Sequence, residues 1–158
     1  MKEITINKNM HLSEHFTLGE VTKTNHMTAD GNIPSHVAIE NLKNLCENWL
    51  EDLRYSHNTL YGEKDEPIII TSGFRSPEVN KLAGGSPTSN HLTGCAVDIR
   101  CIGIEQAIRY ANILLDIADG TKRDYDELLI ERNKQGRYWI HFAVRPKDNR
   151  RKTAFIQT

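Results

Sequence analysis

The sequence has few cysteines, no long apolar run and no surplus of either charge. Its three cysteines are odd in number and show no C-x-x-C spacing, so they are interpreted as reduced thiols and not as a disulfide framework. No stretch of about 18 apolar residues occurs, which argues against a membrane span. The 20 basic and 21 acidic residues give a formal net charge of −1. This balance disfavours a nucleic-acid partner, which requires a basic surplus.

The residues that are present fit one small globular domain. A chain of 158 residues, 38% of them hydrophobic, has the length and the apolar content for a single core. The first sixteen residues contain no apolar stretch after Lys2 and do not resemble a signal peptide, which predicts synthesis in the cytoplasm. We expect a single domain over residues 1–158 that is a monomer, with a basic and loose C-terminal tail over residues 146–158.

Hydrophobic periodicity and turn residues predict a succession of helices and strands. Apolar residues at three- to five-residue intervals predict a long helix over residues 35–54, followed by a polar surface connection over 55–66. Further helices are predicted after the capping box of Thr17 and Glu20 and over residues 77–82 and 104–120. The predicted strands are residues 68–71, 95–100, 127–131 and 138–144. This order indicates an α+β fold with a small, mostly antiparallel sheet packed with helices.

Two histidines and an aspartate are candidate metal ligands. His91 and Asp98 lie seven residues apart where a loop leads into a strand, and a sharp turn at Gly94 would bring both side chains to one point. His141 lies in a second, otherwise apolar strand. Zinc accepts imidazole nitrogen and carboxylate oxygen at about 2.0–2.2 Å, and three protein ligands leave the fourth position open for water, as in catalytic sites.

Each of these residues also has an ordinary structural interpretation. A histidine in an apolar strand is more often a hydrogen-bonded core residue, and Asp98 could form a plain ion pair with a nearby histidine. A buried carboxylate without a cation costs several kcal/mol, so Asp98 requires at least one such partner. Judged by residue type and spacing alone, a metal-free ion-pair cluster in a structural protein therefore stays open beside the metal site.

Several motifs resemble those of the M15 peptidases, the zinc D-Ala-D-Ala carboxypeptidase and dipeptidase group. The segment from Ser89 to Asp98 is similar to the SxHxxGxAxD signature of that group. Residues 139–141, Trp-Ile-His, resemble its C-terminal Trp-x-His, and residues 72–75, Ser-Gly-Phe-Arg, resemble its S-x-[FY]-R element. Together with a Leu-Ser-x-His-Phe segment that begins at Leu12, the resemblance covers about residues 11–145 and indicates the short, phage-associated branch.

The resemblance implies a zinc peptidase domain with a fold like that of hedgehog proteins and D-Ala-D-Ala peptidases. It implies that His91, Asp98 and His141 bind Zn²⁺, which lowers the pKa of a bound water toward about 7 and polarises the peptide carbonyl. The implied substrate is a D-alanine-containing peptide of bacterial peptidoglycan, cleaved as a carboxypeptidase or an endopeptidase would cleave it. The protein would act in the cytoplasm on wall precursors or fragments, or as a phage-type lysin released to the wall by other means.

The general base that this reaction needs is less clearly marked. Many members of the family place an acid three residues before the last histidine, where this chain has Tyr138. The phage-like branch carries a D-x-L-I-x-E run ahead of the Trp-x-His, and residues 126–131 are similar to it. We therefore expect Glu131 to be the general base, with Glu127 as the second candidate.

Three residues are expected to contact the substrate. The planar guanidinium of Arg75 suits a substrate carboxylate or carbonyl and can stabilise developing negative charge. Ser89 either donates to the substrate or holds the loop ahead of the metal ligand. Trp139 shares a strand face with His141 and is expected to form a wall of the site. The five remaining histidines, His57 among them, are expected at the surface.

A second class of function stays open because of Tyr138. Some relatives use the same metal scaffold as a zinc-stabilised binding domain without effective catalysis. A catalytically weak module that binds the cell wall or a protein partner is therefore the alternative to an enzyme.

Overall fold

A mixed β-sheet organises the computed structural model, which describes residues 6–62 and 64–158. Its strands are β1 (Ile70–Ser72), β2 (Ala96–Cys101), β3 (Glu127–Arg132), β4 (Tyr138–Ala143) and β5 (Lys152–Gln157). They lie side by side in the order β1-β2-β4-β3-β5. Only the pairing of β3 with β5 is parallel within the described ranges, and the other pairings are antiparallel. The predicted α+β fold with a mostly antiparallel sheet is therefore confirmed.

The helices begin where the sequence supplies side-chain caps. They are α1 (Leu18–Val21), α2 (His36–Leu45), α3 (Glu51–Tyr61), α4 (Pro77–Leu82) and α5 (Ile104–Thr121). One π-helical turn, η1 (Cys46–Leu50), joins α2 to α3 without a break, and one 3₁₀ turn, η2 (Asn90–Thr93), precedes β2. Thr17, Ser35 and Ser76 each accept a hydrogen bond from a backbone N–H in the first turn of the helix that follows. These starts confirm the predicted N-termini of α1, α2 and α4.

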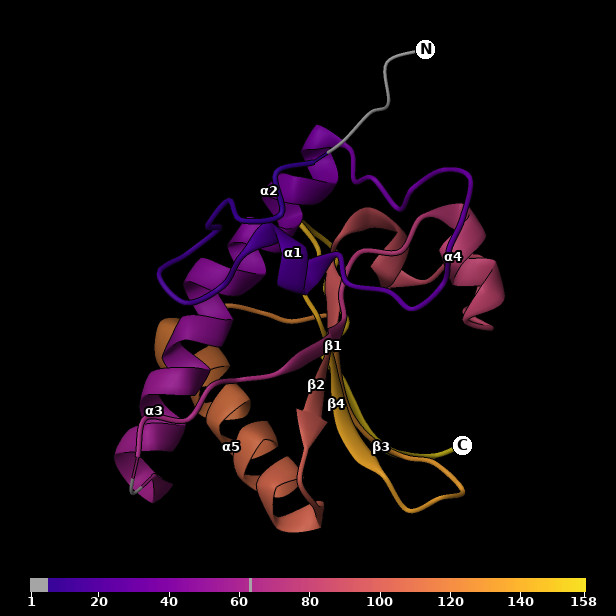
Figure 1. Cartoon of the computed structure of the whole chain (residues 1–158). Coiled ribbons are helices and arrows are strands. Elements are labelled where there is room, and N and C mark those ends of the chain that lie inside the picture. Colours follow the sequence, from indigo (N-terminus) through magenta and orange to yellow (C-terminus); the bar gives the residue numbers. More distant parts are fainter. Residues whose placement is uncertain (1–5, 63) are drawn as a thin grey trace.

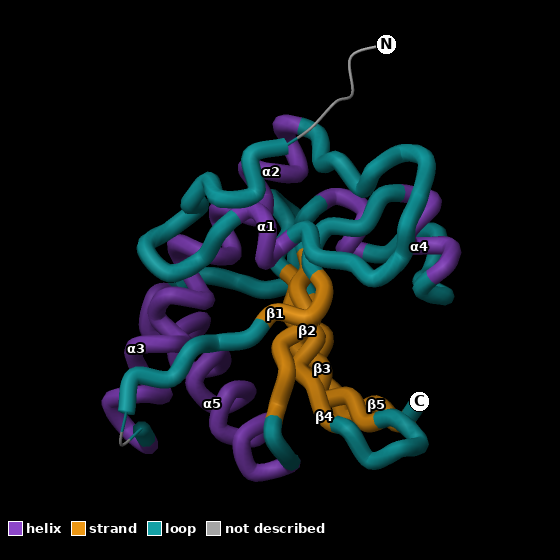
Figure 2. Tube along the Cα trace, in the orientation of Figure 1, coloured by secondary structure: helices purple, strands orange, loops and turns teal. Residues whose placement is uncertain are grey.

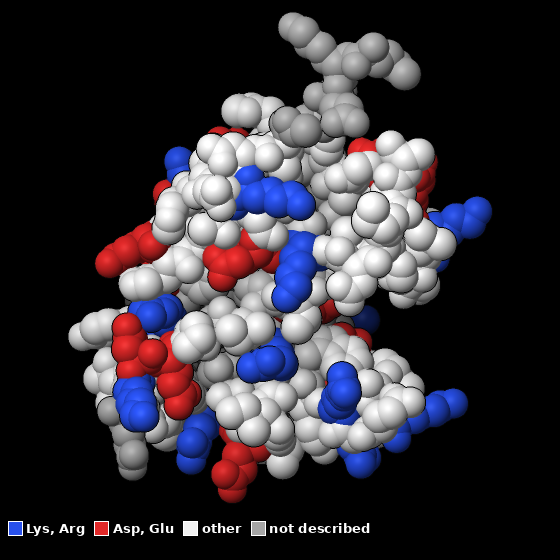
Figure 3. All heavy atoms as spheres, in the orientation of Figure 1, with Lys and Arg blue, Asp and Glu red and all other residues white. Residues whose placement is uncertain are grey.

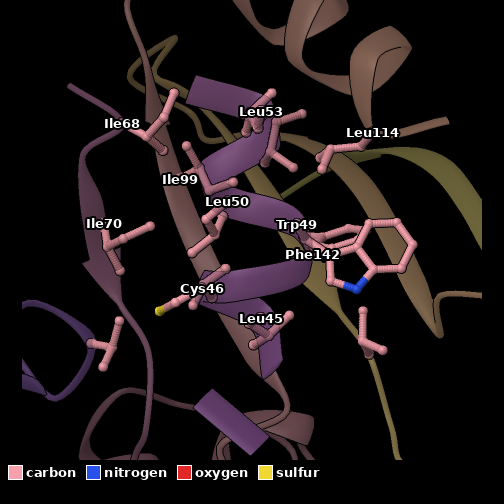
Figure 4. Packing of buried hydrophobic residues seen from close by; sticks show 14 of the residues in the cluster. Leu45, Cys46, Trp49, Leu50, Leu53, Ile68, Ile70, Ile99, Leu114 and Phe142 are labelled. Carbon is pink, nitrogen blue, oxygen red and sulfur yellow. The ribbon is translucent and has the colours of Figure 1, made fainter. Parts of the chain in front are cut away.

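The two faces of the sheet have different characters because side chains alternate along a strand. Figures 1 and 2 show α3 and α5 on one side of the sheet, and α4 on the other side near its upper end. Apolar side chains from β2 and β4, such as Ile99 and Phe142, point toward the long helices and are fully buried. The ring of Phe142 lies 5.1 Å from that of Trp49 in η1 (Figure 4). The opposite face carries the polar residues of the same strands and is open to the groove described below.

The first long helix extends further than the sequence indicated. The prediction of a surface connection from residue 55 is wrong for residues 55–61, which continue α3. This last part of α3 is held by His57, which is only 5% exposed and packs edge-on against Tyr110 of α5 at 4.8 Å between ring centroids. The expectation that His57 lies at the surface is therefore also wrong. Packing against α5, which is distant in sequence, stabilises a polar segment that would not be expected to remain helical alone.

The C-terminal tail is not loose. Residues 152–157 form β5 and pair in parallel with β3, so this part of the prediction is wrong. Backbone bonds from Lys152 N to Asp126 O (2.9 Å) and from Thr158 N to Arg132 O (2.9 Å) close the two ends of the pairing. The strand was missed because a parallel partner is not joined to it by a hairpin that local sequence could indicate.

Three smaller expectations can be compared with the described residues. The three cysteines are free, as predicted, and all three are buried. None of the helices in residues 6–62 and 64–158 combines the length and the apolar content that crossing a membrane requires. The first five residues, on which part of the argument against a signal peptide depends, lie outside the described residues.

Candidate metal centre

The three predicted ligands meet on the open face of the sheet. Asp98 of β2 and His141 of β4 are direct cross-strand partners, and His91 comes from the η2 turn above them. The Asp98 Oδ1 atom lies 3.1 Å from His141 Nδ1 and 3.4 Å from His91 Nε2. One donor atom from each residue lies within 4.8 Å of the others. The structure therefore brings together side chains that are up to 50 positions apart in the sequence.

The turn at Gly94 explains how His91 and Asp98 come together. Gly94 has φ +72°, in the left-handed region that glycine adopts most easily, and a Cβ at this position would lie 2.4 Å from the carbonyl oxygen of Ala38. The turn that precedes it is held by Ser89, whose Oγ accepts the N–H of His91 at 3.2 Å. Of the two roles considered for Ser89, the structure supports holding the loop, although the residue also lines the groove.

Hydrogen bonds on the far sides of both imidazoles fix which nitrogen can bind a metal. His91 Nδ1 lies 2.6 Å from the carbonyl oxygen of Gly73, so this nitrogen carries the proton and Nε2 presents a lone pair toward Asp98. His141 lies between two carboxylates, with Nε2 3.1 Å from Glu127 Oε1 and Nδ1 3.1 Å from Asp98 Oδ1, so a metal bound at Nδ1 would leave the proton on Nε2, directed at Glu127. When a metal replaces the protons between them, the two imidazole nitrogens that face Asp98 and its carboxylate oxygen form a donor set that suits zinc, with outer partners that are typical of zinc sites.

The charges in this cluster stabilise one another. Burial alone would raise the pKa of Asp98, but the neighbouring His91 and His141 outweigh it and hold this pKa well below its usual range. Burial alone would lower the pKa of His141, yet its bonds to Asp98 and Glu127 raise it to about 9. The cluster therefore favours a carboxylate beside positive charge, which is the arrangement a bound cation would use.

Arg75 holds the second oxygen of the aspartate. Its Nη2 lies 3.2 Å from Asp98 Oδ2, and its Nε donates to Ser72 Oγ at 3.0 Å. Because Oδ2 is paired with Arg75, Oδ1 is the oxygen directed toward the two histidines. The guanidinium also lines the groove, so a role in positioning Asp98 and a role in contacting substrate are compatible.

A groove of about 680 Å³ runs over the cluster. The loop after α4 forms one side, including Gly85, and the polar face of the sheet forms the other, including Glu131 and Trp139. Figure 3 shows the outline of the molecule indented on the right, below the region of α4, on the same side as this groove. The three candidate ligands line this groove.

Glu131 lies in the groove next to Trp139, its cross-strand partner. The indole Nε1–H of Trp139 donates to Glu131 Oε2 at 2.6 Å. Burial and the nearby charge of Asp98 raise the pKa of Glu131 above its usual value, as suits a group that must take up a proton. Tyr138, one position away on β4, packs with the core on the other face of the sheet and cannot serve as the base.

Sequence reasoning missed a set of polar residues behind His141. Asn90, Asp126, Arg145 and Arg150 form hydrogen bonds and ion pairs that lead to Glu127. Asp126 was visible only as the first residue of the D-x-L-I-x-E run. Arg150 comes from the tail that was expected to be loose and Arg145 directly precedes that tail, and no local pattern linked either arginine to the site.

A groove over two histidines and an aspartate, with a carboxylate beside them, is the arrangement of side chains that metal-dependent hydrolases use. The chain belongs to peptidase family M15: a family model described as Peptidase M15 matches residues 14–125, which is more than half of the chain. The match includes Arg75, His91 and Asp98 and ends ahead of β3. The α+β fold with a five-stranded mixed sheet is compatible with that of an M15 peptidase. A search of the curated proteins finds no match.

Proposed function

We propose that this protein is a zinc peptidase that hydrolyses D-alanine-containing peptides of bacterial peptidoglycan. The observation that carries the proposal is that His91 Nε2, Asp98 Oδ1 and His141 Nδ1 face one another at the base of a groove. Membership of the M15 family supports the peptidase activity, and the donor set supports zinc. The proposed binding partner is the peptidoglycan peptide that serves as substrate. The proposal includes no binding to nucleic acid or to a membrane.

Each of the side chains around the groove has its own role in the proposed reaction. Zinc, when bound by the two histidines and Asp98, supplies a Lewis acid and lowers the pKa of a water molecule. Glu131 takes the proton of the attacking water and passes it to the leaving amine. Arg75 is placed to bind a substrate carboxylate or carbonyl with the guanidinium N–H groups that Asp98 and Ser72 leave free. Trp139 holds Glu131 and walls the groove.

Replacing Glu131 by Gln tests the catalytic assignment. A positioned general base contributes about 10²- to 10⁴-fold, so E131Q is expected to lower the rate of peptide release by that factor while zinc content stays at one equivalent. The measurement is digestion of purified peptidoglycan with mass spectrometry of the released peptides, which also identifies the bond cleaved. Glu47→Gln, a surface change in η1, is the matched control and should retain full activity.

Two outcomes would contradict the proposal in different ways. Equal rates for E131Q and the unchanged protein would exclude Glu131 as the base. Zinc binding without peptide release by either protein would favour the alternative, which is a zinc-stabilised module that binds the cell wall or a partner. This alternative stays open because Tyr138, at the position where many family members have an acid, packs with the core.

Metal content tests the ligand set separately. His141→Ala is expected to lower the zinc content of the purified protein from one equivalent to below about a tenth, because it removes one of three protein ligands. His15→Ala is the matched control, since His15 lies at the surface between Glu14 and Glu51 in a second histidine-carboxylate group. Zinc that is absent from the unchanged protein, and not taken up when added, would leave the ion-pair cluster as the correct interpretation.

A further inference from the structure

Asp126 is a carboxylate with no exposed surface, located immediately before β3 and outside the candidate ligand set. Arg150 forms a two-point contact with it, from Nε to Oδ1 at 3.0 Å and from Nη2 to Oδ2 at 2.8 Å. The backbone N–H of Arg150 adds a bond to Oδ1 at 3.1 Å, and Arg145 Nε lies 3.2 Å from Oδ2. A buried carboxylate requires such partners, so the segment that precedes β5 is fixed to this point.

Asn90 connects the contacts around Asp126 to the candidate metal centre. Its amide nitrogen donates to Asp126 Oδ2 at 2.8 Å and to Glu127 Oε1 at 2.7 Å, and its amide oxygen accepts from Arg145 Nε at 3.0 Å. Both polar ends of this buried amide are therefore used. Because Asn90 immediately precedes His91, the same contacts also fix the start of the turn that carries the first candidate ligand.

Glu127 links the contacts of Asn90 and Arg150 to His141. Its Oε1 receives both the Asn90 amide and the Nε2–H of His141 at 3.1 Å, and its Oε2 lies 3.8 Å from Arg150 Nη2. A carboxylate held by three partners and directed at the outer nitrogen of His141 is poorly placed to take a proton from water in the groove. Glu131 has no such contact with the imidazole, so the two glutamates have separate tasks.

We propose that Arg145 and Arg150, two residues of the C-terminal segment ahead of β5, are positioning residues of the candidate metal centre. In this proposal, the two arginines hold Asp126 and Asn90. Asn90 in turn orients Glu127. Glu127 then sets the rotation and tautomer of His141, so that Nδ1 binds the metal. Outer-shell partners of metal-bound histidines are worth about 10- to 100-fold in metal affinity. The proposal rests on the zinc site of the proposed function, and it adds that residues beyond the last ligand determine how well the site binds.

Zinc affinity, measured by competition with a chromogenic chelator, tests this role in folded protein. Glu127→Leu is expected to weaken zinc binding about 10- to 100-fold, while Glu127→Gln should stay within about 3-fold because its amide oxygen still accepts the Nε2–H of His141. Arg150→Ala should weaken binding about 3- to 10-fold, as a more distant member of the same chain. Arg151→Ala is the matched control, because this neighbouring arginine pairs with Asp119 and Asp124 at the surface, away from the site.

Two further readouts separate positioning from simple support of the fold. The absorption spectrum of the Co²⁺-loaded protein reports ligand geometry and should change in Glu127→Leu and Arg150→Ala but not in Arg151→Ala. Thermal unfolding of the metal-free proteins measures the structural contribution alone. If Glu127→Leu does not fold, the comparison of Arg150→Ala with Arg151→Ala carries the test.

The outcomes distinguish this inference from the proposed function. An unchanged protein that binds zinc, with equal affinity and an equal cobalt spectrum in Arg150→Ala and Arg151→Ala, would overturn the positioning role and leave the zinc site intact. A lower melting temperature in Arg150→Ala with unchanged zinc affinity would overturn it as well, because the contacts would then only anchor the tail. An unchanged protein that binds no zinc would overturn the proposed function together with this inference.

Discussion

The side chain of Trp139 makes a hydrogen bond to Glu131, the proposed general base. Its indole N–H donates to Glu131 Oε2 at 2.6 Å, which stabilises the charged form of the carboxylate. Trp139→Phe keeps an aromatic ring but removes this donor, so the pKa of Glu131 should rise further. Because a base must be deprotonated, we expect the acid limb of the rate-against-pH profile to move to higher pH, which lowers kcat on the acid side of the profile.

The control for Trp139 is another aromatic residue on the same strand. Tyr138→Phe also changes an aromatic side chain of β4, but it lies on the core face and has no contact with Glu131, so its pH profile should stay unchanged. If Trp139→Phe and the unchanged protein have the same acid limb, the indole N–H does not tune the base.

At this scale the sequence indicated which residues belong to the site but not how they are oriented. Residue types and the spacing of His91 and Asp98 were enough to suggest a metal cluster. The choice of donor nitrogen was not predictable, because it depends on the Gly73 carbonyl for His91 and on Glu127 for His141. Glu127 also illustrates this limit: its residue type suits a base, and only its hydrogen bonds assign it to His141.

At the scale of the elements, the turn between η2 and β2 depends on Gly94. Gly94→Ala would place a Cβ 2.4 Å from the carbonyl oxygen of Ala38 in a left-handed conformation. We expect a destabilisation of about 3 kcal/mol or more, together with weaker zinc binding, since the turn joins His91 to Asp98. Thermal unfolding with and without zinc measures both effects.

Gly84 offers a control with nearly the same backbone angle. Its φ is +74°, and an added Cβ would have no atom within 4 Å. Gly84→Ala should therefore cost only the conformational part, about 1 kcal/mol, or about 2–4 °C in Tm for a domain of this size. Equal losses in both variants would mean that the approach to α2 does not constrain the turn.

The predicted elements were most accurate where the signal is local. Ser35 and Ser76 mark helix starts that the structure confirms, because a cap acts on N–H groups two or three residues away. The end of α3 and the whole of β5 were missed, because both depend on distant partners, Tyr110 for the first and β3 for the second. The register of β3 with β4 was also beyond the sequence, and it pairs Leu129, not a glutamate, with His141.

Across the whole molecule, the sheet separates an apolar face, covered by α3 and α5, from a polar face that carries the charges of the site. On the surface in view in Figure 3, basic and acidic side chains are intermingled, in keeping with the net charge of −1. A carboxylate with no exposed surface lies behind the groove instead, where Asp126 pairs with Arg145 and Arg150 and connects the C-terminal segment to the candidate metal centre. The stability of the molecule at low pH should therefore depend on Asp126.

Asp126→Asn tests this dependence. Burial alone would raise the pKa of Asp126, but its bonds to Arg150 and Asn90 lower it from 3.8 to about 2. A carboxyl group whose pKa is lower in the folded state stabilises the protein above its unfolded pKa, and the stabilisation is lost as the pH falls through the folded value. We expect Asp126→Asn to lower the free energy of unfolding by about 3 kcal/mol near pH 7, because it leaves two arginines without their partner.

That difference from the unchanged protein should hold down to about pH 4 and shrink toward pH 2, and urea unfolding of the metal-free proteins at each pH measures it. Asp119→Asn is the matched control, since Asp119 pairs with Arg151 while 70% of its side chain is exposed, and it should cost less than about 1 kcal/mol throughout. A difference for Asp126→Asn that stays constant from pH 7 to pH 2 would show that the carboxyl contributes through its shape and hydrogen bonds, and not through its charge.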